Sequence, residues 1–136
     1  MEFWNDYSLK ELDKLIKEKP LTKERINYVL QNKIENIEFS DIFEISQIMP
    51  YNNNKYIIFI SLQQPLEERE ISLIHEICHA YYKVGGITAS TPWFGPERRK
   101  AEKIEKRIDE EAQRFYKENK DFVKELYLRL SSEPDN

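Results

Sequence analysis

The chain has 136 residues, a formal net charge of −4 and a charged fraction of 34%. A chain of this length fits one domain, and its single cysteine excludes an intrachain disulfide. No apolar run reaches the roughly 20 residues that span a bilayer, and the N-terminal segment MEFWNDYSLKELDK lacks the pattern of a secretory signal. We therefore predict a cytoplasmic protein without membrane contact, with one domain over residues 1–130 and a disordered tail over residues 131–136.

The charged residues alternate in sign instead of separating into blocks. The densest basic stretch, residues 98–107, is interleaved with glutamates at helical spacing, which is typical of a salt-bridged solvent face. Proteins that bind nucleic acid usually carry a basic surplus or a basic face. The composition therefore argues against direct binding of nucleic acid.

The first half of the chain predicts two helices followed by strands. Ser8 and Glu11 form a capping-box pattern that begins the first helix, and a second helix is expected over about residues 22–32. The apolar run over residues 37–48 breaks strict alternation, which indicates a kinked strand, whereas residues 55–62 (KYIIFISL) form the clearest strand of the chain. We expect these two runs to pair as an antiparallel hairpin.

The second half of the chain is predicted to be helical. Helices are expected over about residues 66–83, 96–119 and 121–130. Gly85 and Gly86 supply a C-terminal stop for the first of these helices, and the loop that follows carries two exposed-looking aromatic residues, Trp93 and Phe94. This order of elements indicates an α+β domain, in which the helices pack on one face of a short antiparallel sheet.

His75, Glu76 and His79 form an H-E-x-x-H pattern inside a predicted helix and include the only two histidines of the chain. Residues four apart lie above one another on a helix, so the two imidazoles can bind one ion. Glu76 lies next to the first of them and can act on a water molecule as general base. The pattern indicates Zn²⁺, which lowers the pKa of its bound water toward about 7.

The third ligand is less clear from the residues alone. A catalytic zinc ion usually has three protein ligands, and no third histidine exists in the chain. The candidates are a carboxylate, for which the next long helix is the natural source, or Cys78. We interpret Cys78 as a small apolar filler of its helix, because it points elsewhere around the turn than the neighbouring His79.

From about Tyr56 to Phe115 the chain resembles the ImmA/IrrE family of gluzincin-like metallopeptidases. The resemblance lies in the strand KYIIFIS, the helix ISLIHEICHAYY and the later segment RIDEEAQRFY. In this family the later helix typically reads E-x-x-A-(N/D)-x-F-A, and its first Glu completes the zinc site.

Two alignments of this family pattern are open. Alignment through Ala112 and Phe115 assigns the ligand position to Asp109, and this alignment is preferred. The alternative assigns the ligand position to Glu105, one turn earlier, with Asp109 four residues further on. That second alignment puts Glu111 where an apolar residue is expected.

The resemblance implies a small zincin-like domain and a zinc metalloendopeptidase, with His75, His79 and Asp109 as metal ligands and Glu76 as the catalytic residue. It also implies a protein substrate, namely a helix-turn-helix transcriptional repressor of phage, mobile-element or stress regulation. The strand over residues 55–62 is the candidate edge for binding an extended substrate. The alternative is a peptidase-fold binding module that senses or sequesters a partner without cleaving it, since Asp is one methylene shorter than the usual Glu.

Overall fold

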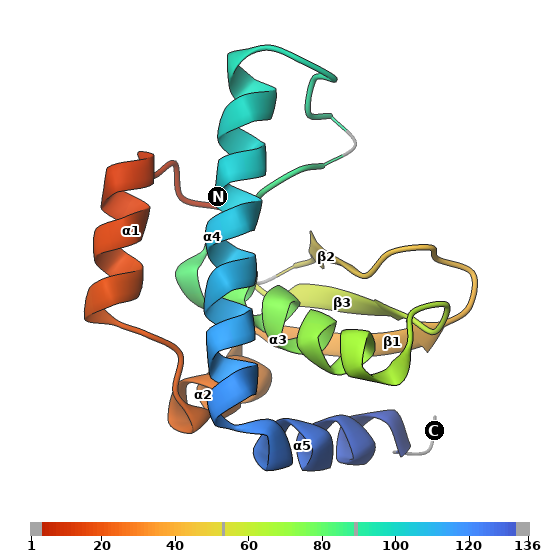
Figure 1. The fold of residues 1–136 in the computed structure, drawn as a ribbon. Coiled ribbons are helices and arrows are strands. Elements are labelled where there is room, and N and C mark those ends of the chain that lie inside the picture. The colour runs from red at the N-terminus through yellow and green to blue at the C-terminus, as the bar shows by residue number, and fades with distance from the viewer. Residues whose placement is uncertain (1–3, 53, 89, 133–136) are drawn as a thin grey trace.

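The computed structural model describes residues 4–52, 54–88 and 90–132, and it shows five helices and a small mixed sheet in this part of the chain (Figure 1). The elements are α1 (Leu9–Glu18), α2 (Lys23–Asn32), β1 (Ile34–Ser40), β2 (Gln47–Pro50), β3 (Tyr56–Ser61), α3 (Leu66–Tyr82), α4 (Pro96–Glu118) and α5 (Lys120–Ser132). The predicted α+β fold class is confirmed. Helix α5 extends two residues into the segment predicted as a disordered tail, and the rest of that segment, 133–136, lies outside the described residues.

Both N-terminal helices begin at a residue whose side chain caps the first turn. The Ser8 hydroxyl accepts a hydrogen bond from the Glu11 backbone N–H at 3.1 Å, and the Glu11 carboxylate accepts one from the Ser8 backbone N–H at 3.1 Å. Thr22 caps α2 in the same way by accepting from the Arg25 N–H. These contacts satisfy N–H groups that a helix leaves without partners in its first turn, so the predicted capping box is confirmed.

The sheet differs from the predicted antiparallel hairpin. The strand order is β1-β3-β2: β2 pairs with β3 antiparallel, as expected, whereas β1 pairs with β3 in parallel. The run over residues 37–48 is therefore not one kinked strand, because it ends at Ser40 and resumes at Gln47 on the opposite side of β3. Since β3 is the central strand, it has no free edge, and the prediction that it binds an extended substrate is wrong.

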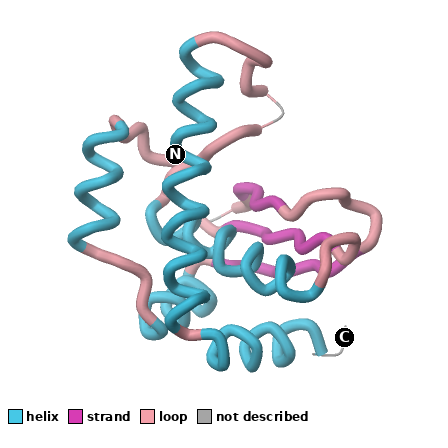
Figure 2. The backbone as a smooth tube through the Cα atoms, viewed as in Figure 1, coloured by secondary structure: helices cyan, strands magenta, loops and turns pink. Residues whose placement is uncertain are grey.

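Helix α3 packs against the sheet, and α4 crosses α3 steeply (Figures 1 and 2). Alternate residues of β3, Ile58 and Ile60, are fully buried in the same core as Leu73 and Ile77 of α3. The predicted apolar stripe of α4 is buried throughout and consists of Ala101, Ile104, Ile108, Ala112 and Phe115. The stripe fixes which side of α4 faces α3, and with it the direction in which the acidic residues of α4 can point.

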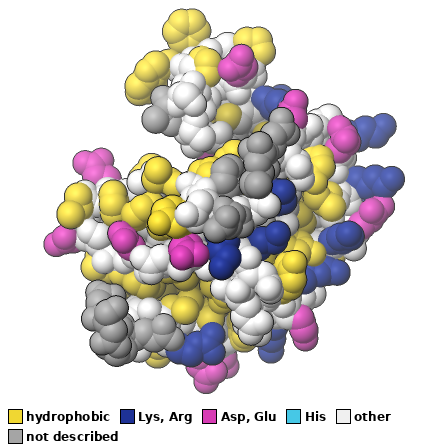
Figure 3. Space-filling model, turned by 180° about the vertical axis from the view of Figure 1, so that it is seen from behind, with side chains coloured by type: hydrophobic (Ala, Val, Ile, Leu, Met, Phe, Trp, Pro, Cys, Tyr) yellow, Lys and Arg dark blue, Asp and Glu magenta, His cyan; other side chains and the backbone are white. Residues whose placement is uncertain are grey.

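The basic residues of α4 lie on a solvent face, as predicted. Lys100 pairs with Asp6 at 3.1 Å, and Arg107 pairs with Asp13 of α1 at 2.7 Å. Seen from behind, dark blue Lys and Arg side chains stand among magenta Asp and Glu side chains on the right of the molecule, the side on which α1 lies (Figure 3). None of the described helices is both long enough and apolar enough to cross a membrane.

Glu111 is an acidic residue in the buried part of α4. Its side chain accepts hydrogen bonds from the Leu21 backbone N–H at 2.7 Å and from the guanidinium of Arg114 at 2.7 and 2.8 Å. Arg114 in turn donates to the Leu21 carbonyl at 3.0 Å. This small network ties α4 to the segment between α1 and α2, so the charge is buried together with its partners.

We expect Glu111→Ala to lower the free energy of unfolding by about 1.5–3 kcal/mol, because it leaves the buried Leu21 N–H and part of the Arg114 guanidinium without partners. Urea denaturation followed by circular dichroism measures this change. Glu118→Ala is the matched control, since Glu118 pairs with the same arginine from an exposed position and should cost less than about 1 kcal/mol. Equal effects of the two substitutions would contradict a tying role for Glu111.

Candidate metal centre

Helix α3 carries the H-E-x-x-H residues in its last two turns. His75 and His79 lie one turn apart, with ring centroids separated by 5.0 Å. His79 is buried, whereas His75 is partly exposed, so the pair extends from the core to the surface of the domain. The helix ends at Lys83, which adopts the left-handed conformation with φ 54° and directs its backbone N–H to the His79 carbonyl.

Helix α4 brings a carboxylate to both imidazoles. Oε1 of Glu105 lies 3.0 Å from Nε2 of His75 and 2.8 Å from Nε2 of His79. Asp109, the residue preferred from the sequence as third ligand, lies one turn further on and approaches only Nδ1 of His75, at 3.4 Å. The geometry therefore favours Glu105 over Asp109 at the third-ligand position.

The far side of each imidazole is held by a hydrogen-bond acceptor. Nδ1 of His79 donates to the Val84 carbonyl at 2.7 Å, and Nδ1 of His75 faces the Asp109 carboxylate. An imidazole whose Nδ1 carries the proton presents a lone pair at Nε2 when it is neutral. Both Nε2 atoms are directed toward Glu105: a protonated Nε2 donates a hydrogen bond to its carboxylate, and a neutral ring would present the Nε2 lone pair to a metal ion at the same place.

The donor set fits a zinc ion. One nitrogen of each histidine and one carboxylate oxygen of Glu105 all lie within 4.8 Å of one another, and this is the group of potential metal ligands found among the described residues. Two imidazoles and one carboxylate match a catalytic zinc site that keeps a fourth position open. Cys78 is fully buried and lies outside this group, and burial raises the pKa of its thiol, so its interpretation as an apolar filler holds.

The electrostatics of the site follow from burial and from these contacts. Burial lowers the pKa of His75, but the hydrogen bonds with Asp109 and Glu105 outweigh it and raise the pKa from 6.5 to about 10. Burial raises the pKa of Glu105, but the hydrogen bonds with His75 and His79 reverse this and hold the pKa well below its usual range. Glu76 is 5% exposed, and burial raises its carboxyl pKa despite the two nearby imidazoles. Glu76 thus has an increased affinity for a proton beside the three candidate ligands.

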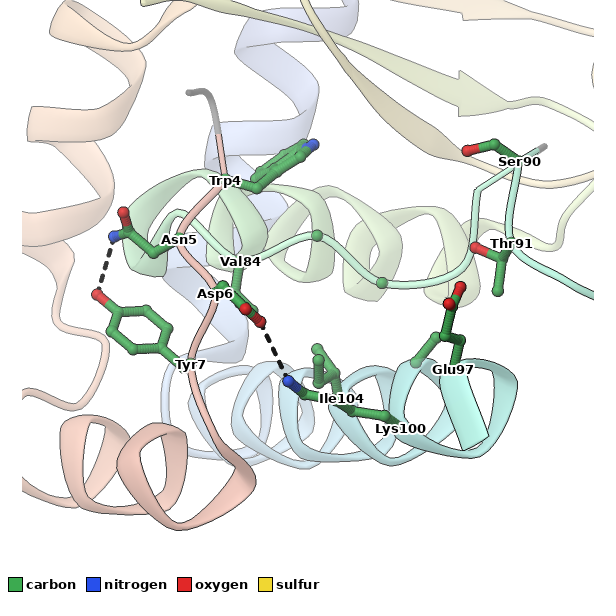
Figure 4. Close-up of a pocket in the computed structure, with 13 residues that line it drawn as sticks. Trp4, Asn5, Asp6, Tyr7, Val84, Ser90, Thr91, Glu97, Lys100 and Ile104 are labelled. Carbon is green, nitrogen blue, oxygen red and sulfur yellow. Dashed lines mark hydrogen bonds and ion pairs between the residues drawn. The ribbon is translucent and has the colours of Figure 1, made fainter. Parts of the chain in front are cut away.

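The N-terminal segment contacts the site from outside the motif. The Trp4 ring stacks on Tyr56 with centroids 4.8 Å apart, and its edge approaches His79 at 6.4 Å. A cavity of about 440 Å³ lies beside this segment, between the chain that follows α3 and the first turns of α4 (Figure 4). Neither Trp4 nor the Val84 carbonyl could be found from the sequence, because one contact joins distant segments and the other uses a backbone atom.

Comparison with known proteins identifies a family for this chain. The family profile described as the IrrE N-terminal-like domain, a peptidase family, matches residues 36–123, which is more than half of the chain and includes both histidines, Glu76, Glu105 and Asp109. No curated protein and no solved structure matches the chain significantly.

With no metal ion bound, we expect an imidazole that titrates far above the ordinary histidine pKa of 6.5, near pH 10. Because this pKa is raised in the folded state, the contacts of His75 stabilise the fold fully below about pH 6.5 and lose their effect as the pH rises toward about 10. Proton NMR of metal-free protein tests this, since only two histidines contribute signals. Asp109→Asn should lower the pKa, and the absence of any imidazole titrating above about pH 8 would contradict the assignment.

Proposed function

This chain belongs to the peptidase family of the IrrE N-terminal-like domain, and we propose on this premise that it is a zinc-dependent metallopeptidase acting on a protein substrate. The observation that carries the proposal is the convergence of His75, His79 and Glu105, whose potential ligand atoms lie within 4.8 Å of one another. Glu105, and not Asp109, is the third ligand in this proposal. With Glu105 at the first position, the acidic position of the family pattern falls on Asp109.

Asp109 orients a ligand instead of binding the metal. Its carboxylate faces Nδ1 of His75, and the Val84 carbonyl faces Nδ1 of His79. Acceptors in these positions select the tautomer that presents Nε2 to the metal and hold each ring in place. Two ligands are thereby oriented by groups that do not themselves reach the ion.

Glu76 acts as the general base and general acid. His75, His79 and Glu105 would hold the zinc ion, which would supply Lewis-acid chemistry to the substrate carbonyl and to the attacking water. Glu76 takes a proton from the attacking water and transfers it to the leaving amine. Its burial supports this role, because the raised carboxyl pKa favours uptake of the proton.

An extended substrate segment would bind at β2, which is one of the two edge strands of the sheet and is linked to the site through two aromatic residues. Pro50 of β2 pairs with Tyr56 of β3, and Tyr56 stacks on the Trp4 ring, whose edge approaches His79. Strand addition to an edge is a common way of binding an unfolded segment of a protein. We propose a helix-turn-helix repressor as the substrate, with DNA bound by that partner and not by this chain.

The non-catalytic binding module is the weaker proposal. The reason for it was the assignment of Asp109 as third ligand, because an Asp side chain is one methylene shorter than the usual Glu. With Glu105 close to both imidazoles, at 3.0 and 2.8 Å, that reason no longer applies. Binding of a repressor without cleavage would still favour the binding module, and the repressor cleavage assay can give this outcome.

We predict about one zinc ion per purified chain, whereas His79→Ala and Glu105→Ala should keep only a residual affinity that is too low to retain the ion through purification. Asp109→Ala should weaken zinc binding only about 10- to 100-fold, because it removes an orienting contact. Glu110→Ala changes an exposed neighbour on the same helix and serves as the control. Competition with a chromophoric chelator measures the affinities. A larger loss in Asp109→Ala than in Glu105→Ala would reverse the assignment of the ligand.

We predict that Glu76→Gln retains zinc and lowers peptidase activity by about 10²- to 10⁴-fold, because the amide keeps the shape of the side chain but cannot take up a proton. The assay incubates the zinc-loaded protein with helix-turn-helix repressors of the same genome, beginning with any encoded beside its own gene. Cleavage fragments are identified by mass spectrometry. Undiminished cleavage by Glu76→Gln would remove the role given to Glu76, and repressor binding without cleavage by the unmodified chain would favour the binding module.

A further inference from the structure

Gly86 lies in the chain segment that follows α3, and its backbone does not explain why the residue is glycine. Gly85 and Gly86 were expected to end α3, but the left-handed position at the end of this helix belongs to Lys83. Among the described glycines, only Gly95 has a positive φ. A residue with a side chain can therefore adopt the backbone conformation of Gly86. The reason for glycine has to lie in what surrounds it.

The backbone of Gly86 lies against the carboxylate of Glu105. A Cβ atom on Gly86 would lie 2.5 Å from both Cδ and Oε2 of Glu105, and 2.8 Å from its Cγ. The next residue, Ile87, donates its backbone N–H to Oε2 of Glu105 at 3.1 Å. Oε1 of the same carboxylate lies at the two imidazoles. One oxygen of Glu105 is thus held by this segment while the other faces the proposed metal position.

We propose that Gly86 is a positioning residue of the metal centre: its missing side chain provides the space in which Glu105 reaches both imidazoles. This inference rests on the proposed metal site. The same short segment also contains Val84, whose carbonyl holds His79. Two of the three ligands are therefore held by backbone groups of this segment, His79 by the Val84 carbonyl and Glu105 by the Ile87 N–H.

The methyl group of an alanine at position 86 would clash with the flexible end of the Glu105 side chain. The substitution should therefore weaken metal binding without preventing the protein from folding. Glu105 is 28% exposed and can turn away from an added methyl group without moving either helix. That rotation would take its oxygen away from His75 and His79. Gly85 offers a contrast, because a Cβ there would meet the Trp4 ring at 3.2 Å and no metal ligand.

The test compares Gly86→Ala with Gly85→Ala in the full chain. We expect Gly86→Ala to bind zinc about 10- to 100-fold more weakly, in the range found when orienting contacts of metal ligands are removed. Gly85→Ala should bind zinc within about 3-fold of the unmodified protein. Chelator competition gives the affinities, and the thermal unfolding of metal-free protein reports whether each variant folds.

A double-mutant cycle shows whether the methyl group acts through Glu105. In the Glu105→Ala background the carboxylate is absent, so Gly86→Ala should cause no further loss of the residual zinc affinity. Should Gly86→Ala alone fold poorly, the double variant should still fold, because the obstacle to the methyl group has been removed.

Three results would overturn the inference. The first is a zinc affinity of Gly86→Ala equal to that of the unmodified protein, and the second is the same loss in the Glu105→Ala background. The third is a double variant that fails to fold. Absence of zinc binding in the unmodified chain has a different meaning, because it would contradict the proposed function, and the inference would fall with it.

Discussion

A carboxylate from α4 must reach two imidazoles on α3 at the edge of an apolar core. Oε1 of Glu105 meets this condition, with Ile104 and Ile108 buried on either side of it along α4. Burying polar groups is unfavourable unless each has a partner. No buried side-chain nitrogen or oxygen among the described residues lacks one, so the site adds polar groups to the core edge without leaving any of them unsatisfied.

The rest of the domain holds this crossing in place. The sheet gives α3 an apolar face to pack on, and the Glu111–Arg114 network connects α4 to the segment between the first two helices. The N-terminal segment adds an aromatic contact to His79 through Trp4. Contacts from several parts of the chain restrict the movement of α4 relative to α3, and a preorganised set of ligands needs that restriction.

The sequence predicts the helical elements well because they depend on local patterns. Capping at Ser8 and the one-turn spacing of His75 and His79 are both confirmed. The third ligand is different, because it depends on the rotation of α4. Glu111 at a position expected to be apolar is the argument against the Glu105 alignment, yet Glu111 is buried with partners, namely Arg114 of its own helix and the backbone N–H of the distant Leu21. The parallel pairing of β1 likewise depends on where the loop after Ser40 leads, which no local pattern specifies.

A crystal structure of the protein grown with zinc is the most direct measurement of the proposed ligand set. We expect one ion bound by Nε2 of His75, Nε2 of His79 and a carboxylate oxygen of Glu105, each at about 2.0–2.2 Å, with Asp109 on the far side of the His75 ring. An ion bound by Asp109 in place of Glu105, or bound away from the two histidines, would contradict this ligand set.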